Sequence, residues 1–246
     1  MSEATVVATD AEPSFRVVDS RLMVKVFYAF AILFVLSAAI SLVGKWIGAS
    51  IAMAGYTDDP TVHEIVIGNN VIAAPANTIR FALARRDGIA NRLDLYMRWP
   101  LLDGYSEAAR GDFNHTSPAK RIVFLSFEDR MMSRDMSGRF EPIYSSLITR
   151  PGVPGANGIT TYRFTPVSGY LDEVLVVAKR QGKDPFVARC LTGPSGDESL
   201  APCERDIHVG DNLSLTYRFP AELLSDWQAL DESVLTRTKL MLRTTN

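Results

Sequence analysis

The side chains best suited to acid–base or metal chemistry are few and widely separated in this sequence. The three histidines are His63, His115 and His208, and none has a second ligand at the spacing typical of a zinc site. Asp206 and His208 are two residues apart in a predicted strand, so both side chains would project from the same side of a sheet. We interpret this pair as part of a solvated face. The sequence therefore predicts no catalytic residue, no metal site and no bound cofactor.

Motifs of large enzyme families are also missing from the sequence. There is no G-x-S-x-G of a serine hydrolase, no phosphate-binding loop, no dinucleotide fingerprint and no EF-hand loop. The net charge of −2, from 26 basic and 28 acidic residues, disfavours a general nucleic-acid binder. These patterns are more typical of a binding or assembly protein than of an enzyme.

Arginine is the one charged residue type that stands out, since it outnumbers lysine by 20 to 6. Several arginines lie beside acids along the chain, and we interpret them as mixed-sign surface pairs. The alternative is that arginine-rich loops assemble a site for an anionic ligand of the cell envelope. The basic residues concerned are Arg85, Arg86, Arg130, Arg134 and Arg139, and the acids beside them are Asp87, Glu128, Asp129 and Asp135.

A long uncharged segment near the N-terminus is predicted to anchor the rest of the chain to a membrane. Residues 26–44 contain 19 residues without a charge, VFYAFAILFVLSAAISLVG, between Lys25 and Lys45. As a helix this segment would span roughly 28 Å, close to the hydrocarbon core of a bilayer. It predicts a transmembrane helix, and a buried helix of a soluble protein is the less favoured alternative because no polar face interrupts the segment.

The basic residues predict the orientation of this helix. Arg16, Arg21 and Lys25 precede the apolar segment, whereas only Lys45 follows it before Arg80. The positive-inside rule then places the N-terminus in the cytoplasm and the rest of the chain outside it. The small residues at 52–54 match a signal-peptidase site, but they lie well beyond the apolar segment. We therefore favour an uncleaved anchor over cleavage after Ala54.

Three regions follow from these patterns: a cytoplasmic tail at residues 1–24, a transmembrane helix with its stalk at 25–55, and an outer domain at 56–246. Gly44, Gly48 and Ala52 fall on one stripe of the helix, a spacing that permits close approach of two helices. Helix-mediated self-association is therefore a further hypothesis.

The outer domain reads as a series of short strands with turn residues between them. Alternation and apolar runs predict a mainly-β (α+β) domain with sandwich-like sheets and a C-terminal amphipathic helix. Leu223, Trp227, Leu230 and Val234 recur at helical spacing in that last segment, with Asp231 assigned to its polar side. We expect the helix to pack on the sheet, and the alternative is a detachable arm. The predicted strands are 62–67, 79–83, 92–99, 121–127, 160–164, 173–178, 186–190, 206–209 and 213–219.

The two cysteines frame a loop within this outer domain. Cys190 and Cys203 flank LTGPSGDESLAP, between strand-like segments that could pair as a hairpin. Because disulfides persist outside the cytoplasm, we predict a Cys190–Cys203 disulfide rather than two free thiols. A closed loop of this size is expected to add about 3 kcal/mol of stability.

The chain resembles proteobacterial single-pass membrane-anchored proteins of unknown function. The stretches that carry the resemblance are PANTIRF (75–81), LDLYMRWP (93–100) and SGYLDEVLVV (168–177). The resemblance implies an inner-membrane anchor with a periplasmic domain, and it supplies no active-site residues. We therefore expect a non-enzymatic interaction or assembly module with an envelope protein partner, while a tethered hydrolase or anion-binding protein is the alternative.

Overall fold

The computed structural model describes residues 20–53, 55–115 and 120–243. The chain divides into two compact units, Met1–Met53 and Ala54–Asn246, and each is described by itself. We call the second unit the β domain. Most of the predicted cytoplasmic tail lies outside the described residues.

The first unit is one long helix, α1 (Ser20–Met53), of 34 residues. Within it, Met23–Val43 is long and apolar enough to cross a membrane, and none of this span is buried within the protein. The helix begins before Lys25 and continues through Lys45 to Met53, so the predicted stalk is helical. The residues at 44, 48 and 52 lie on α1, and self-association through them stays a prediction.

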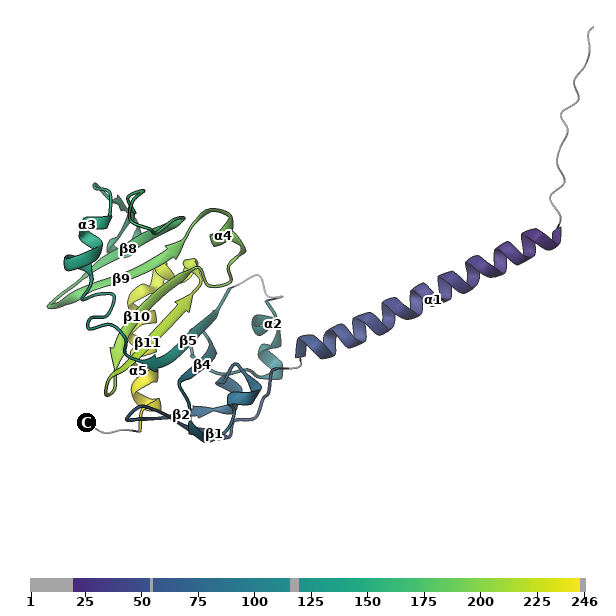
Figure 1. Cartoon of the computed structure of the whole chain (residues 1–246), viewed down its shortest axis with the longest axis horizontal. Coiled ribbons are helices and arrows are strands. Elements are labelled where there is room, and N and C mark those ends of the chain that lie inside the picture. Colours follow the sequence, from purple (N-terminus) through teal and green to yellow (C-terminus); the bar gives the residue numbers. More distant parts are fainter. Residues whose placement is uncertain (1–19, 54, 116–119, 244–246) are drawn as a thin grey trace, which may run out of the picture. The chain divides into compact units, whose positions relative to one another are not determined.

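The β domain consists of a large antiparallel sheet and a small sheet (Figure 1). The large sheet has eight strands in the order β4-β5-β11-β10-β9-β8-β7-β6, and the small one has the order β2-β1-β3. The strands are β1 (Val62–Ile67), β2 (Asn70–Pro75), β3 (Gly88–Ile89), β4 (Arg92–Arg98), β5 (Ile122–Asp129), β6 (Val153–Pro154), β7 (Ile159–Arg163), β8 (Glu173–Arg180), β9 (Lys183–Leu191), β10 (Cys203–Val209) and β11 (Leu213–Phe219). The helices of the domain are α2 (Arg110–Phe113), α3 (Ser145–Leu147), α4 (Gly193–Glu198) and α5 (Trp227–Met241).

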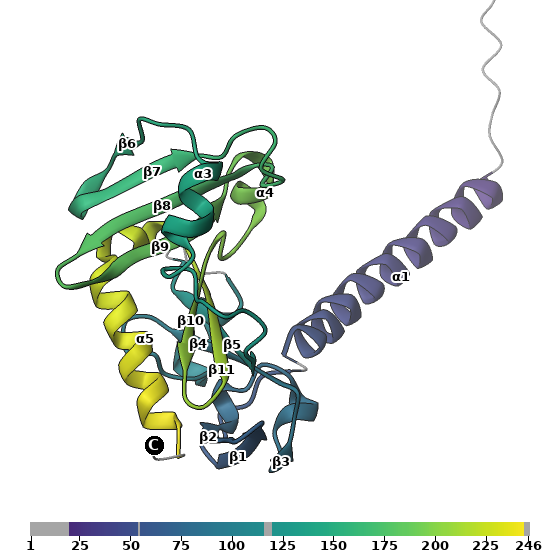
Figure 2. The same ribbon diagram turned by 60° about the vertical axis from the view of Figure 1, so that its left-hand side comes forward.

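The main core lies on one face of the large sheet. Apolar side chains of β4, β5 and β8–β11 meet those of the small sheet and of α5 in one buried cluster. Figure 2 shows α5 along this face, and contacts from Trp227 to Phe186 on β9 and from Leu242 to Ile72 on β2 mark its two ends. A second, smaller cluster lies on the opposite face at the β7–β9 end, under the helical turns of residues 140–147.

The fold is the predicted one: one apolar N-terminal helix, a mainly-β domain with two sheets and a C-terminal helix. The expected strand 79–83 is wrong, because Ile79 forms only an isolated bridge with Leu95 and Ala82–Ala84 is a 3-10 turn. Strand β2 was missed because its start looked like turn residues. Gly68 has φ +55°, and Ile67 pairs with Asn70 across a two-residue hairpin loop.

Helix α5 packs through a buried charge as well as through apolar side chains. The side chains of Trp227, Leu230 and Val234 are buried, as the helical pattern predicts. The assignment of Asp231 to the polar side is wrong, since this residue is only 3% exposed. Its carboxylate accepts hydrogen bonds from Arg180, Arg205 and Tyr217 of the sheet, which join the helix to three strands.

The start of the β domain is fixed by an aromatic cluster. The ring of Tyr56 stacks on Tyr105 with centroids 4.9 Å apart, and its hydroxyl donates to the carbonyl of Phe113 at 2.9 Å. Arg85 donates to the carbonyl of Gly55. The folded domain therefore includes the residues directly after position 54.

Candidate binding groove

The three histidines lie at separate places in the β domain. His63 Nδ1 lies 3.2 Å from Asp87 Oδ1, and His115 is exposed beside residues outside the described part of the chain. His208 is opposite Ser214 on the open face of the large sheet, while Asp206 binds Arg139 instead of forming a His–Asp pair. Within the described residues, no three His, Cys, Asp or Glu side chains are grouped as a metal site requires.

Two arginines of the arginine-rich loops also lie at separate places. Arg85 donates to the backbone carbonyls of Gly55 and Ile79, which is a structural role. Arg139 pairs with Asp206, and its guanidinium lies over the Tyr144 ring at 5.9 Å. Burial raises the pKa of Asp206, and the charge of Arg139 acts in the opposite direction. Arg85 and Arg139 therefore hold contacts at separate places, while an anion site made of the arginine-rich loops stays a prediction.

An open face of the large sheet provides a different site. Strands β4, β5 and β11 bury alternate side chains in the main core, so the intervening side chains point to the other face. At this end of the sheet they line a groove of about 530 Å³. Its floor contains Phe124, Ser126 and Thr216, and Ser126 pairs with Thr216 across β5 and β11.

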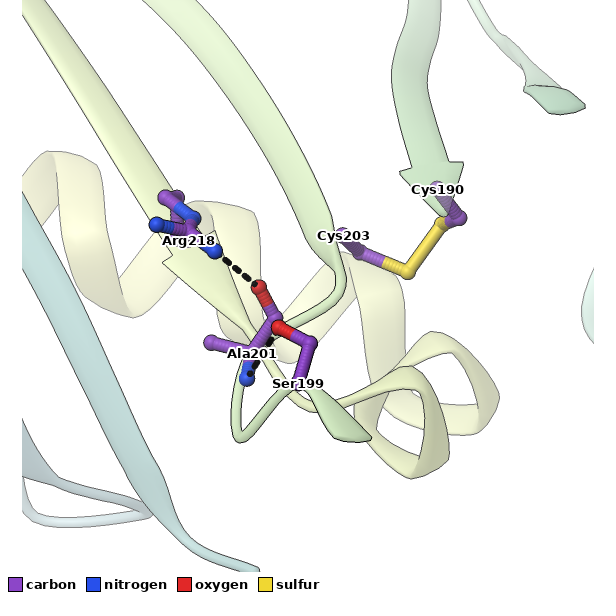
Figure 3. The surroundings of a disulfide bond; sticks show 5 residues. All are labelled: Cys190, Ser199, Ala201, Cys203 and Arg218. Carbon is purple, nitrogen blue, oxygen red and sulfur yellow. Dashed lines mark hydrogen bonds between the residues drawn. A yellow bond between two sulfur atoms is a disulfide. The ribbon is translucent and has the colours of Figure 1, made fainter. Parts of the chain in front are cut away.

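The walls of the groove come from two loops. Arg80 lies on one side, where its backbone N–H donates to the carbonyl of Asp94 on β4 at 2.9 Å. Residues 198–201, at the end of α4 and in the loop after it, form the other side. Arg218 of β11 donates to the carbonyl of Ala201 at 3.2 Å and holds this wall against the sheet (Figure 3).

The disulfide stands at the base of the second wall. Cys190 and Cys203 are directly paired residues of β9 and β10, and the structure joins them as the spacing predicts (Figure 3). The loop between them packs tightly, because a Cβ on Gly196 would lie 2.6 Å from the carbonyl oxygen of Leu191. The bond therefore closes the loop that shapes the groove.

Ion pairs order the polar side chains along this face. Arg92 Nε lies 2.9 Å from Asp94 Oδ1, and its Nη1 lies 3.7 Å from Glu128 Oε2. Asp94 also accepts a hydrogen bond from the Ser126 hydroxyl at 2.8 Å. The carboxylates on the floor are thus held by neighbours in the groove itself.

A second group of charges continues past the groove onto β9. Arg189 pairs with Glu204 and lies 3.5 Å from Glu173. Burial raises the pKa of Glu173, and the charge of Arg189 opposes this shift. The open face therefore carries a row of acidic and basic side chains, which is suited to binding through complementary charges and hydrogen bonds.

Sequence reasoning missed the residues that line the groove. Arg80 falls in the segment that was expected to be a strand. Phe124 was read only as part of the apolar run at 121–127, and Arg218 only as part of the predicted strand 213–219. The sequence reasoning assigned neither Phe124 nor Arg218 to a face of its strand. That β11 lies next to β5, and so brings these two side chains together, has no local signal.

The chain has no match among family models or curated proteins, and the solved structures that align with it share little sequence identity. The proteobacterial resemblance therefore stays a prediction. Among solved structures, an immunity protein of the Stenotrophomonas maltophilia type IV secretion system aligns with a TM-score of 0.48 and 13% identity, over 77% of this chain and 95% of that one. The iron-regulated outer membrane lipoprotein FrpD of Neisseria meningitidis aligns with a TM-score of 0.42 and 11% identity, over 75% of this chain and 96% of that one.

Both neighbours belong to proteobacterial envelope or secretion systems, but likeness at this level carries no argument about the activity of this chain. The fold and site define a coarser class. The described residues contain one helix apolar enough to span a membrane and a disulfide-closed β domain that presents a groove of mixed charge.

Proposed function

We propose that this protein is a non-enzymatic interaction module of the cell envelope, tethered to the inner membrane by α1 with the β domain in the periplasm. The observation that carries the proposal is the groove on the open face of the large sheet. It has about 530 Å³ of space, paired charges along its floor and a wall closed by a disulfide. Such a rigid, pre-formed polar surface reduces the entropy cost of binding a partner.

The state of the carboxylates favours binding over catalysis. A general acid or base needs to reach a substrate proton, whereas Asp94 is engaged by Arg92 and Ser126 and Glu204 is engaged by Arg189. The disulfide supports a position outside the cytoplasm, where such bonds persist. The bias of basic residues before the apolar segment supports the same orientation.

Site-specific photocrosslinking in intact cells tests the proposal. A photoreactive amino acid replaces Ser126 on the groove floor, and the matched control replaces Arg163, an exposed residue on β7 several strands away. We expect a discrete protein adduct from position 126 and none from position 163. Equal adducts from both positions, or no adduct from position 126, would contradict the proposed function.

A further inference from the structure

The charges in the groove are not all neutralised by one another. Three arginines and four acidic residues line it. Arg92 binds both Asp94 and Glu128, and Glu204 is paired with Arg189 outside the groove. Three of the four acids therefore lie within ion-pair distance of an arginine, although Asp94 and Glu128 share Arg92.

Two arginines remain without an acidic partner. Among the described residues, no carboxylate lies within 4.0 Å of the guanidinium of Arg80 or Arg218. Both side chains are exposed and both line the groove. The fourth acid, Glu198, is the last residue of α4 and lies on the rim of the groove. The lining as a whole has one acid more than it has arginines, and Arg80 and Arg218 are the two of its arginines that no described carboxylate engages.

Phe124 brings these two arginines to one place. The guanidinium carbon of Arg80 lies 5.2 Å from the centroid of the Phe124 ring and 5.2 Å from that of Phe81. Arg218 is the residue of β11 directly opposite Phe124 of β5. Paired residues on one face of a sheet have Cβ atoms about 4.5–5.5 Å apart, so Arg218 extends from a position next to the Phe124 side chain that Arg80 contacts.

This arrangement suits carboxylate recognition. A guanidinium stacked on aromatic rings keeps the N–H donors at its edge available, and the fork of donors matches the two oxygens of a carboxylate. Hydrogen bonds between charged groups are about twice as strong as neutral ones. Arg218 uses one donor on the carbonyl of Ala201 and retains others for a ligand.

Resting on the proposed function, we propose that the groove binds an acidic segment of a protein partner and that Arg80 and Arg218 hold its carboxylates beside Phe124. The groove is far larger than a single anion requires. The acids elsewhere in it, including Glu198 at the rim, oppose a uniformly anionic surface such as a lipid headgroup layer. The segment therefore carries carboxylates only at the Phe124 end.

The segment binds across the face of the sheet and does not extend it by another strand. The outer edge of β4 is occupied, because its Asp94 carbonyl accepts the Arg80 N–H and Arg98 pairs with Asp103 of the following loop. Side-chain contacts therefore provide the affinity, and charge substitutions should have large effects.

Fluorescence anisotropy on the purified full chain tests this inference. The probe is a labelled ten-residue peptide with three adjacent glutamates in a Gly-Ser frame, and its control has glutamine in their place. We expect the glutamate peptide to bind and the glutamine peptide to bind at least tenfold more weakly. Arg80→Gln and Arg218→Gln should each weaken binding of the glutamate peptide by roughly tenfold, as expected for loss of a charge-assisted hydrogen bond.

Arg163→Gln is the matched control, because it removes the same charge from an exposed position on β7. It should leave the affinity within about twofold of the wild type, and unchanged melting of all three variants verifies folding. Equal affinity for the two peptides, no binding of either, or an equal loss in Arg163→Gln overturns the inference. Displacement of the peptide by inorganic phosphate at the same concentration also overturns it, since the groove would then select a free anion.

Crosslinking distinguishes failure of the acidic-ligand inference from failure of the proposed interaction function. If position 126 still forms its adduct at wild-type level in the Arg80→Gln, Arg218→Gln double variant, the groove is an interface but its ligand is not acidic. If position 126 forms no adduct even in the wild type, the proposed function fails as well. Loss of the adduct in the double variant, with retention in Arg163→Gln, supports both.

Discussion

Replacement of Asp231 by alanine is the sharpest test of how α5 is held to the sheet. The Oδ1 atom of Asp231 accepts from Arg205 Nε at 3.1 Å and from the Tyr217 hydroxyl at 2.7 Å, and Oδ2 accepts from Arg180 at 2.8 Å. Arg205 itself is only 1% exposed. Asp231→Ala therefore leaves a buried guanidinium without its counter-charge.

The expected cost follows from that unpaired charge. Removal of one member of a buried ion pair costs about 3–5 kcal/mol, because arginine stays protonated and its desolvation is no longer compensated. Arg205 keeps hydrogen bonds to the Ser137 hydroxyl and the Val187 carbonyl, both at 2.9 Å, which favours the lower half of this range. For a domain of this size a loss of about 3–4 kcal/mol lowers the melting temperature by roughly 6–16 °C.

A double-mutant cycle shows whether the pair is the cause. Urea unfolding of the full chain in detergent micelles, followed by tryptophan fluorescence, compares Asp231→Ala, Arg205→Met and the double variant. The double variant should lose much less than the sum of the single losses, because it contains no unpaired charge at this position. The neighbouring exposed Glu232→Ala is the control and should stay within about 0.5 kcal/mol of the wild type. Additive losses would refute the reasoning.

The same network makes stability depend on pH in the alkaline range. Burial raises the pKa of Tyr217 well above its ordinary value, and the charge of Arg205 acts in the opposite direction. The unfolded tyrosine ionises near pH 10, whereas the native hydroxyl stays protonated. The stabilisation from Tyr217 is therefore full below about pH 10 and is lost as the pH rises towards the native pKa. The stability gap between wild type and Tyr217→Phe should narrow from pH 8 to 11, and a constant gap would contradict this assignment.

Three further predictions concern the helix, the disulfide and the topology. Trp227 is 2% exposed, so Trp227→Ala should lower the free energy of unfolding by about 3–5 kcal/mol; an unchanged melting curve, as in the exposed control Leu240→Ala, would instead favour a detachable arm. Cys190 and Cys203 should resist alkylation in unfolded protein until a reductant is added, and full labelling without reductant would rule out the bond. Cys190→Ser should lower the free energy of unfolding by a few kcal/mol at most, since the length of the closed loop predicts about 3 kcal/mol. Alkaline phosphatase fused after residue 246 should be active and a cytoplasm-only reporter there silent, and the reverse pattern would overturn the orientation.

The features that the sequence predicts well are those with a local cause. The apolar segment before Lys45 needs no partner to be recognised, because its length and lack of charge already match a bilayer. Strand β5 is recognisable from its own apolar run, and the two cysteines are recognisable from the loop between them. Each of these predictions depends on fewer than about twenty consecutive residues.

The groove could not be predicted in this way, because it depends on strand order. Phe124 and Arg218 are separated by many residues and meet only because β11 inserts between β5 and β10. Arg80 joins them through one backbone hydrogen bond from a loop to β4. Alternation fixes which face a side chain occupies, but not which strand lies beside it.

Asp231 and Arg80 are two charged residues whose surroundings could not be predicted from neighbouring residues in the sequence. A charged residue is normally exposed, so a helical pattern assigns Asp231 to solvent; it is buried because donors from β8, β10 and β11 converge on it. Arg80 has no acid beside it in the sequence and gave no signal, yet its guanidinium stacks on two aromatic rings, and no described carboxylate lies within ion-pair distance of it. The buried charge of Asp231 thus has its partners within the fold, whereas Arg80 is one of the two arginines that we propose bind a ligand.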